Sequence, residues 1–343
     1  MRPETRHLPR GLAAQCAGML LLFLAAAIAF AQKAASTLRP SQQGKPKIVY
    51  FAMFLVDVDE VSSANQSFTA NLYYELQWKD PQQAHDGASS ITKPLDAVWN
   101  PRVLILNQQK LFKTMSETVE VTPEGTVIYR QRVWGHFSQP LDLRKFPMDT
   151  QTFAIQLVSA RYSPAEVSFV RSPDWNSGIA KRFSLADWDI LSWKITPGVY
   201  RALDQGPGSA LVTFSLEAKR KVDYYTMNLI LPLMFIVAMS WIAFWLHPTE
   251  SGTKFSVSVT AMLTLIAYRF AVASQLPMIS YMTRMDFFTF YGTVLVFLTL
   301  IEVVIATTLA KQHKVKAAQT IDFWARALFP AAFALLTWRA FFL

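Results

Sequence analysis

The chain has 343 residues, of which 52% are hydrophobic and only 17% are charged, and its formal net charge is +9. This composition argues against a water-soluble protein, and the scattered basic residues beside long apolar runs argue against nucleic acid as a partner. The five histidines lie far apart, without the spacing of metal ligands, and no phosphate loop or nucleophile motif is present. We therefore expect a membrane protein that is not an enzyme and holds no metal or cofactor.

The first 31 residues have the pattern of a secretory signal peptide. Three arginines precede an apolar stretch from about residue 11 to 30, which ends in the small-residue pattern Ala29-Phe30-Ala31. We predict that residues 1–31 are a cleaved signal; the alternative is an uncleaved anchor helix. Cys16, the single cysteine, lies in this segment, so we expect no disulfide in the mature chain.

Short stretches with alternating apolar and polar residues fill the chain from about 47 to 221. In residues 211–219 the even-numbered positions are apolar and the odd-numbered ones are mostly polar, which is typical of a half-buried strand. Similar stretches occur at 68–78, 126–134, 152–158 and 187–195. Because the chain returns through turns such as 122–126, with no long helices between, residues 32–223 are predicted to form an extracellular, all-β, immunoglobulin-like β-sandwich.

Four long apolar stretches follow the predicted sandwich. They lie at about 226–246, 255–276, 287–310 and 321–343. Each has about the 20 residues that an all-α membrane span requires, so we predict a transmembrane four-helix domain over 224–343. The short basic loop after the third span is then cytoplasmic, in agreement with a sandwich outside the cell membrane.

The second apolar stretch carries a row of small, hydroxylic and bulky apolar side chains at spacings of four and three. The row is Ser256, Thr260, Leu263, Ala267, Phe270 and Ser274. Such a row either packs inside a helix bundle or lines a water-filled pore. In the second case, several copies around an axis place apolar rings at Leu263 and Phe270, which close a pore by excluding water.

Charged residues also lie within and beside the second and third spans. Glu250 and Lys254 flank the inner end of the row, where we expect their charges to stay hydrated. Arg269 and Glu302 lie within spans and are expected to make separate polar contacts, because their depths in the membrane differ.

The segment "QPLDLRKFPMDTQTF" at 139–153 contains Phe-Pro-x-Asp, and it resembles the signature loop of the Cys-loop receptors. Gln139 and Phe153 stand where that loop has paired cysteines, as in bacterial members. The sequence "PRVL" after Trp99, "EAKRKVDYY" before the first span and "RALFP" at 326–330 follow the same family order. The whole mature chain therefore resembles the bacterial pentameric ligand-gated ion channels, and among them the amine-gated channel.

This resemblance implies a homopentamer in a bacterial inner membrane, with the sandwich in the periplasm. A small-molecule agonist would bind between neighbouring sandwiches and open a pore for monovalent ions, in contact with membrane lipids. We expect Glu250 to attract cations, whereas Lys254 would repel them. A membrane-anchored ligand-binding sensor without ion conduction is the alternative function.

By the same resemblance, Tyr73 and Tyr200 occupy aromatic positions of the agonist site. The chain departs from the amine-gated relative at Leu104, Ala160 and Ser209, so a different agonist is expected. Arg130 either favours an anionic ligand or is only a solvated strand residue. Tyr162 is either a further ligand contact or a core tyrosine.

Coupling between the two domains is assigned, also by resemblance, to the signature loop. Pro147 and Asp149 are expected to press on the linker around Pro277 to Arg284, and Asp149 is expected to pair with Arg220. The alternative is that Asp149 only closes its own turn.

Overall fold

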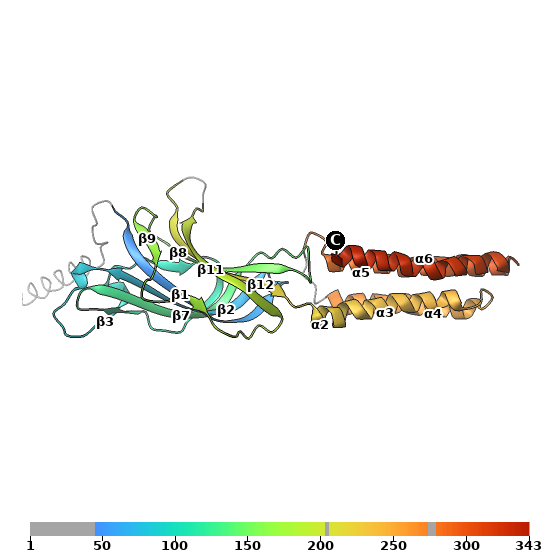
Figure 1. The fold of residues 1–343 in the computed structure, drawn as a ribbon, viewed down its shortest axis with the longest axis horizontal. Helices are drawn as coiled ribbons and strands as arrows, with labels where there is room; N and C mark the ends of the chain where they lie inside the picture. Colours follow the sequence, from blue (N-terminus) through green and yellow to red (C-terminus); the bar gives the residue numbers. More distant parts are fainter. Residues whose placement is uncertain (1–44, 203–205, 274–278, 343) are drawn as a thin grey trace, which may run out of the picture.

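The computed structural model describes residues 45–202, 206–273 and 279–342. The molecule is elongated, with a β-sandwich at one end and long helices running side by side at the other (Figure 1). The predicted signal segment 1–31 lies outside the described residues.

Two sheets form the sandwich. The eight-stranded sheet contains β1 (Lys47–Ser62), β2 (Ser67–Lys79), β3 (Ile91–Pro94), β5 (Gln108–Lys113), β6 (Thr118–Val121), β7 (Thr126–Ser138), β9 (Val167–Arg171) and β10 (Gly178–Ile179). The four-stranded sheet has the order β11 (Trp188–Tyr200), β12 (Ser209–Arg220), β8 (Thr150–Ser159) and β4 (Val103–Ile105). Two short 3-10 helices, η1 (Pro81–Gln83) and η2 (Leu95–Ala97), interrupt the strands.

The predicted alternation places one face of each strand in the core between the sheets. On β12, Val212, Phe214 and Leu216 are at most 1% exposed, and they pack in the same cluster as core residues of β2 and β7. The turn between β6 and β7 includes Gly125, whose φ of 77° favours glycine. The fold class predicted from the sequence, a β-sandwich followed by helices, is confirmed.

The first membrane helix runs from Asp223 to Trp245 as several joined segments. They are α2 (Asp223–Tyr225), the π-helical η3 (Thr226–Ile230), α3 (Leu231–Ser240) and the 3-10 helical η4 (Trp241–Trp245). Pro232 lies in the first turn of α3. Proline lacks an amide hydrogen and its ring crowds the carbonyl four residues earlier, which accounts for the wider π turn that precedes it.

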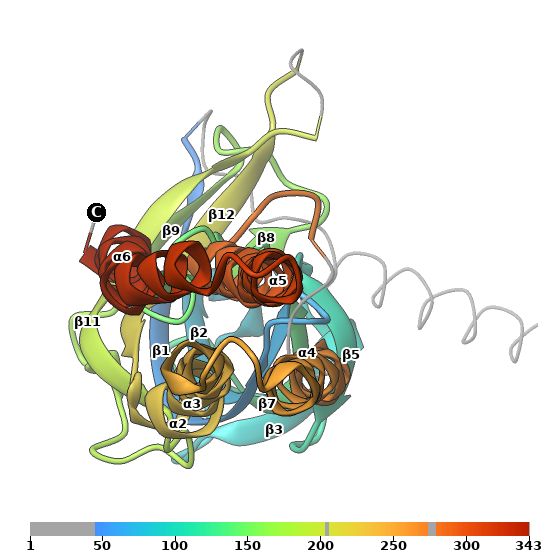
Figure 2. The ribbon, with the colours of Figure 1, turned by 90° about the vertical axis from the view of Figure 1, so that its right-hand side faces the viewer.

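Three further helices complete the bundle: α4 (Ser251–Ala273), α5 (Arg284–Lys311) and α6 (Val315–Phe342). Among the described residues, three helices are long and apolar enough to cross a membrane: Asp223–Trp245, Ser251–Val272 and Arg284–Lys311. The fourth, α6, is 28 residues long, carries charged residues at 316, 322, 326 and 339, and lies along α5 (Figure 2). It begins six residues before the predicted fourth span, because residues 315–320, with Lys316, Gln319 and Thr320, continue the helix beyond the apolar stretch.

Candidate functional site

One group of predicted ligand residues lies on the eight-stranded sheet. Tyr73 of β2 and Arg130 of β7 are both partly exposed and share the face of the sheet that points away from the core. Arg130 donates from Nε to Glu75 at 2.7 Å and from a terminal nitrogen to Glu120 at 2.6 Å. Its guanidinium also lies 6.0 Å from the centre of the Trp175 ring. Sequence reasoning found Arg130 but missed these partners, because the strand pairing that joins them is not local.

The electrostatics of this group follow from these bonds. Burial disfavours the charged form of Arg130, but its hydrogen bonds to Glu120 and Glu75 outweigh burial and raise the pKa of the guanidinium. The same hydrogen bond from Arg130 lowers the pKa of Glu120. Burial, with the nearby Glu75 carboxylate, raises the pKa of the Tyr73 phenol. Arg130 therefore stays charged, and two carboxylates more than compensate for its charge.

A mostly apolar pocket of about 310 Å³ adjoins this group. Its lining residues are Ala52, Met53, Phe54, Val56, Tyr73, Arg132, Trp175 and Asn176. Trp175 is 47% exposed, so its ring is open to contact from outside the chain. The aromatic faces of Tyr73 and Trp175 line this pocket together with one cationic side chain, Arg132, which donates from Nε to Asn71 at 2.9 Å.

The second group of predicted ligand residues lies by the four-stranded sheet. Tyr162 follows β8, and its hydroxyl accepts a hydrogen bond from the buried Trp99 indole at 3.0 Å. Tyr200 is the last residue of β11 and pairs with Ser209 of β12. Neither tyrosine lines the pocket that contains Tyr73. The two groups thus belong to different sheets of the chain.

The predicted row on the second span lies on one face of α4. Ser256, Thr260, Leu263, Ala267 and Phe270 are all exposed, with Leu263 61% and Phe270 78% exposed. The opposite face, with Ser258, Ala261 and Leu265, is fully or almost fully buried against the other helices. Ser274, the last residue of the predicted row, lies outside the described residues. The row therefore faces away from the chain's own bundle.

The two charged residues at the start of α4 differ in environment. Glu250 is exposed in the turn before the helix. Lys254 is 0% exposed, and its ammonium lies 2.6 Å from Asp322 of α6. This differs from the expectation that both charges stay hydrated, because the turn geometry of α4 places Lys254 on the face that holds Ser258 and Ala261.

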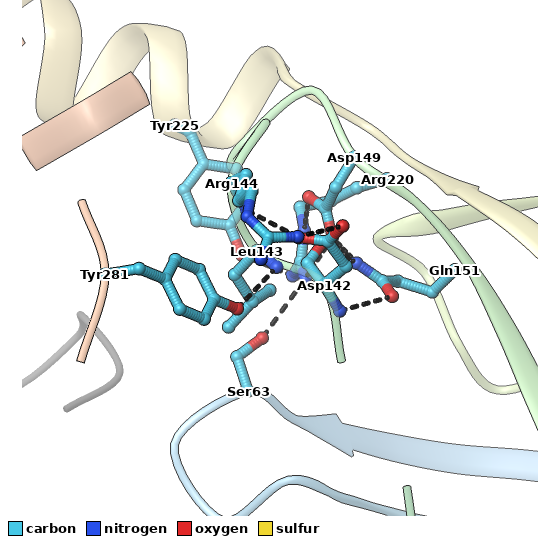
Figure 3. Close-up of polar contacts among 9 residues, drawn as sticks. All are labelled: Ser63, Asp142, Leu143, Arg144, Asp149, Gln151, Arg220, Tyr225 and Tyr281. Atoms are coloured by element: carbon cyan, nitrogen blue, oxygen red, sulfur yellow. Dashed lines mark hydrogen bonds and ion pairs between the residues drawn. The ribbon is translucent and has the colours of Figure 1, made fainter. Parts of the chain in front are cut away.

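Two of the predicted coupling residues, Asp149 and Arg220, meet where the sandwich joins the helices (Figure 3). Arg220 binds Asp149 through two hydrogen bonds, of 2.8 and 3.2 Å, and both side chains are only 2% exposed. Arg220 also donates to the hydroxyls of Tyr225 and Ser63, each at 3.1 Å. The predicted ion pair is thus present, and Asp149 does more than close its own turn.

Aromatic rings surround this pair. The guanidinium of Arg220 lies 4.2 Å from the Trp188 ring, 5.1 Å from Phe146 and 5.6 Å from Tyr225. Burial disfavours the charged form, but Asp149 outweighs burial and raises the pKa of Arg220. Pro147, also buried, follows Phe146 through a cis peptide bond. Sequence reasoning missed the aromatic cage, which gathers residues from β11, the signature loop and α2.

The linker after α4 contacts the signature loop directly. The hydroxyl of Tyr281 accepts from the Leu143 amide at 3.0 Å (Figure 3). It also donates to the Leu141 carbonyl at 3.2 Å. The Arg284 amide donates to the Arg144 carbonyl at 3.0 Å, so the first residue of α5 is also tied to this loop. Pro277 lies outside the described residues, so the described contact is made by Tyr281 and Arg284.

Two family models match the chain. Residues 30–222 match the neurotransmitter-gated ion-channel ligand binding domain, and residues 229–317 match the neurotransmitter-gated ion-channel transmembrane region. These families are membrane receptors and channels rather than enzymes, and they are typically oligomeric and gated by a small agonist. The order of the two matches agrees with the sandwich and helices described above. The chain therefore belongs to the neurotransmitter-gated ion-channel family.

Proposed function

We propose that five copies of this chain form a ligand-gated cation channel, with α4 of each copy lining a shared pore. The observation that carries the proposal is the exposed row on α4, whose hydroxyl and apolar side chains face away from the chain's own bundle. Five copies would place Ser256 and Thr260 as hydroxyl rings and Leu263 and Phe270 as apolar constrictions. Apolar rings close a pore by excluding water.

The proposed domains have different roles. Residues 1–31 act as a signal that directs residues 32–223 to the periplasmic side of a bacterial inner membrane. Residues 224–343 form the multi-pass membrane domain, in contact with lipid. The exposed apolar side chains of the helices, such as Phe235 and Trp324, support this assignment.

The agonist site would lie between neighbouring copies. Tyr162 and Tyr200 of one copy would face Tyr73 and Arg130 of the next, which accounts for their separation on different sheets. The ligand class that we propose is a small organic cation, because the aromatic faces of Tyr73 and Trp175 attract cations. The charge of Arg130 supports an anionic ligand less well.

Cation conduction is supported by the charges at the start of α4. Five exposed Glu250 carboxylates would attract monovalent cations, whereas Lys254 is buried and paired with Asp322. The route from ligand to pore runs through Pro147, Asp149 and Arg220 to Tyr281 on the linker that follows α4.

The test is reconstitution of the purified full-length protein in planar bilayers, with a screen of amines, amino acids and carboxylates. We expect amine-evoked current, a reversal potential that follows the cation gradient and five subunits by native mass spectrometry. Ligand binding without current from a correctly assembled protein would instead indicate an anchored sensor. A reversal potential that follows chloride would overturn the assignment of Glu250.

A further inference from the structure

Three charged side chains from three helices form a cluster in the half of the bundle away from the sandwich. We call Lys254, Glu302 and Asp322 the buried charge cluster. Lys254 lies in the first turn of α4, Glu302 on α5 and Asp322 on α6. They are 0%, 7% and 1% exposed, so the cluster is closed to solvent in this arrangement.

The hydrogen bonds in the cluster are unequal. Lys254 donates to Oδ1 of Asp322 at 2.6 Å. Among the described residues, the second oxygen of Asp322 and both carboxylate oxygens of Glu302 have no hydrogen-bond partner. Asp322 and Lys254 are the charged groups that act on the Glu302 carboxyl. The lysine is therefore committed to Asp322, while Glu302 lies beside the pair without a donor.

In the part of the chain that the structure describes, the neighbouring helices contribute few other charges. The helix over 226–246 has no charged residue, and Glu302 is the single charge on α5 between Asp286 and Lys311. Arg326 on α6 donates to the Phe244 carbonyl, and the His247 ring contacts Thr249 and Gln319. With Glu302 ionised, the described cluster would hold two negative charges and one positive charge.

A buried carboxylate without a donor or counter-ion is strongly disfavoured, whereas a buried protonated carboxyl is disfavoured much less. A proton on Glu302 makes the cluster neutral and leaves the pair between Lys254 and Asp322 intact. We propose that Glu302 is a proton-binding site, and that release of its proton regulates the position of α4. The consequence for ion flow rests on the proposed channel function; the proton site does not.

The coupling to α4 follows from the place of Lys254. When Glu302 gives its proton to water, two carboxylates compete for one ammonium group. Lys254 is then drawn between Asp322 and Glu302, and it carries the base of α4, two residues before Ser256, with it. Raising the pH at the end of the bundle away from the sandwich is therefore expected to change gating, while the same change at the sandwich side does not act on this site.

The first test measures proton linkage without ion flow. Thermal unfolding of the full-length protein in lipid nanodiscs is followed between about pH 5 and 9 for wild type, Glu302→Gln and, as a matched exposed control, Glu250→Gln. If the folded state keeps a proton on Glu302 that the unfolded state releases in this range, stability falls as the pH rises. We expect this fall in wild type and Glu250→Gln and its loss in Glu302→Gln. Parallel profiles for all three proteins would overturn the proton site.

A second variant covers the case in which Glu302→Gln fails to fold. Asp322→Asn leaves Lys254 free to pair with an ionised Glu302, so the fall in stability should move to lower pH. An unchanged profile would contradict the proposal. A stability that changes when sodium is exchanged for potassium at constant pH would also contradict the proposal, because the bound species would then be a metal cation.

The second test measures agonist-evoked current with the pH varied only at the end of the bundle away from the sandwich. We expect the half-maximal agonist concentration of wild type to change by about fivefold or more and that of Glu302→Gln to stay constant. Absence of current in every protein refutes the channel, whereas the unfolding profiles still decide the proton site. Current with equal pH responses in wild type and Glu302→Gln refutes regulation by this residue.

Discussion

Replacing Asp149 with alanine removes the only carboxylate that Arg220 binds among the described residues. The guanidinium then stays buried beside Trp188, Phe146 and Tyr225, with two hydroxyl acceptors but no counter-ion. Removing one partner of a buried ion pair typically costs about 3 to 5 kcal/mol, because the remaining charge is left uncompensated. With both side chains 2% exposed, we expect a loss in this range, reduced where water enters the space left by the carboxylate.

The share of the gating free energy that falls on each subunit is smaller than this loss. Shifting a channel from 1:99 to 99:1 open takes about 5.5 kcal/mol, which is about 1.1 kcal/mol for each of five proposed sites. If one third of this free-energy loss destabilises the open state relative to the closed state, it offsets the roughly 1.1 kcal/mol that one bound agonist supplies. We therefore expect Asp149→Ala to assemble normally and to lose most of its agonist-evoked current.

The assay pairs patch recordings with size-exclusion chromatography of the same protein. Asp142→Ala is the matched control, since Asp142 lies in the same loop and its pair with Arg144 is 63% and 69% exposed, for which a cost below about 1 kcal/mol is expected. Asp149→Ala with Arg220→Ala completes a double-mutant cycle, in which the two losses should not add. Normal current at normal agonist dose in Asp149→Ala, or additive losses in the cycle, would refute the reasoning.

Three further outcomes are expected. Leu263→Ser should increase spontaneous opening, because a polar ring no longer excludes water from the pore. Ile266→Ser is the control, since Ile266 is 41% exposed on the same helix. Equal spontaneous currents for the two variants in patch recordings would show that Leu263 is not the gate. Thr283→Ala removes the side-chain cap of α5 and should cost about 0.5 to 2 kcal/mol in thermal unfolding, with an unchanged midpoint as the contrary result. The hydrogen bond from Arg130 lowers the pKa of Glu120 in the folded state below 4.5. This interaction therefore stabilises the fold above pH 4.5, and its contribution is lost as the pH falls through the folded-state pKa of Glu120. Melting curves of Glu120→Gln should lack this acid-side loss, and a curve parallel to wild type would contradict it.

Local pattern was sufficient for much of the fold. Alternation in 211–219 predicts β12 and the correct buried face, since burial of a strand repeats every two residues. The row on α4 was also readable, because helical spacing alone brings Thr260 and Leu263 to one face. The expected β-hairpin at 122–126 forms, with Gly125 in the left-handed region.

Contacts between distant segments were not readable in the same way. Lys254 was expected to be hydrated, but its partner Asp322 lies 68 residues away on a helix whose rotation the sequence does not reveal. Arg130 likewise meets Glu75 only because β2 and β7 pair in a register that sets these two residues opposite each other. The pairing of Asp149 with Arg220 was anticipated from the family resemblance, not from spacing.

The length of β12 has a mechanical consequence. Its 12 residues run without a break from Ser209 to Arg220, a distance of about 40 Å at the usual rise per residue. We therefore expect a displacement at Ser209 to be passed along the strand to Arg220, because no loop interrupts β12 between these two residues. Inserting a single residue in the strand would turn every following side chain to the opposite face, and Arg220 would point away from its carboxylate.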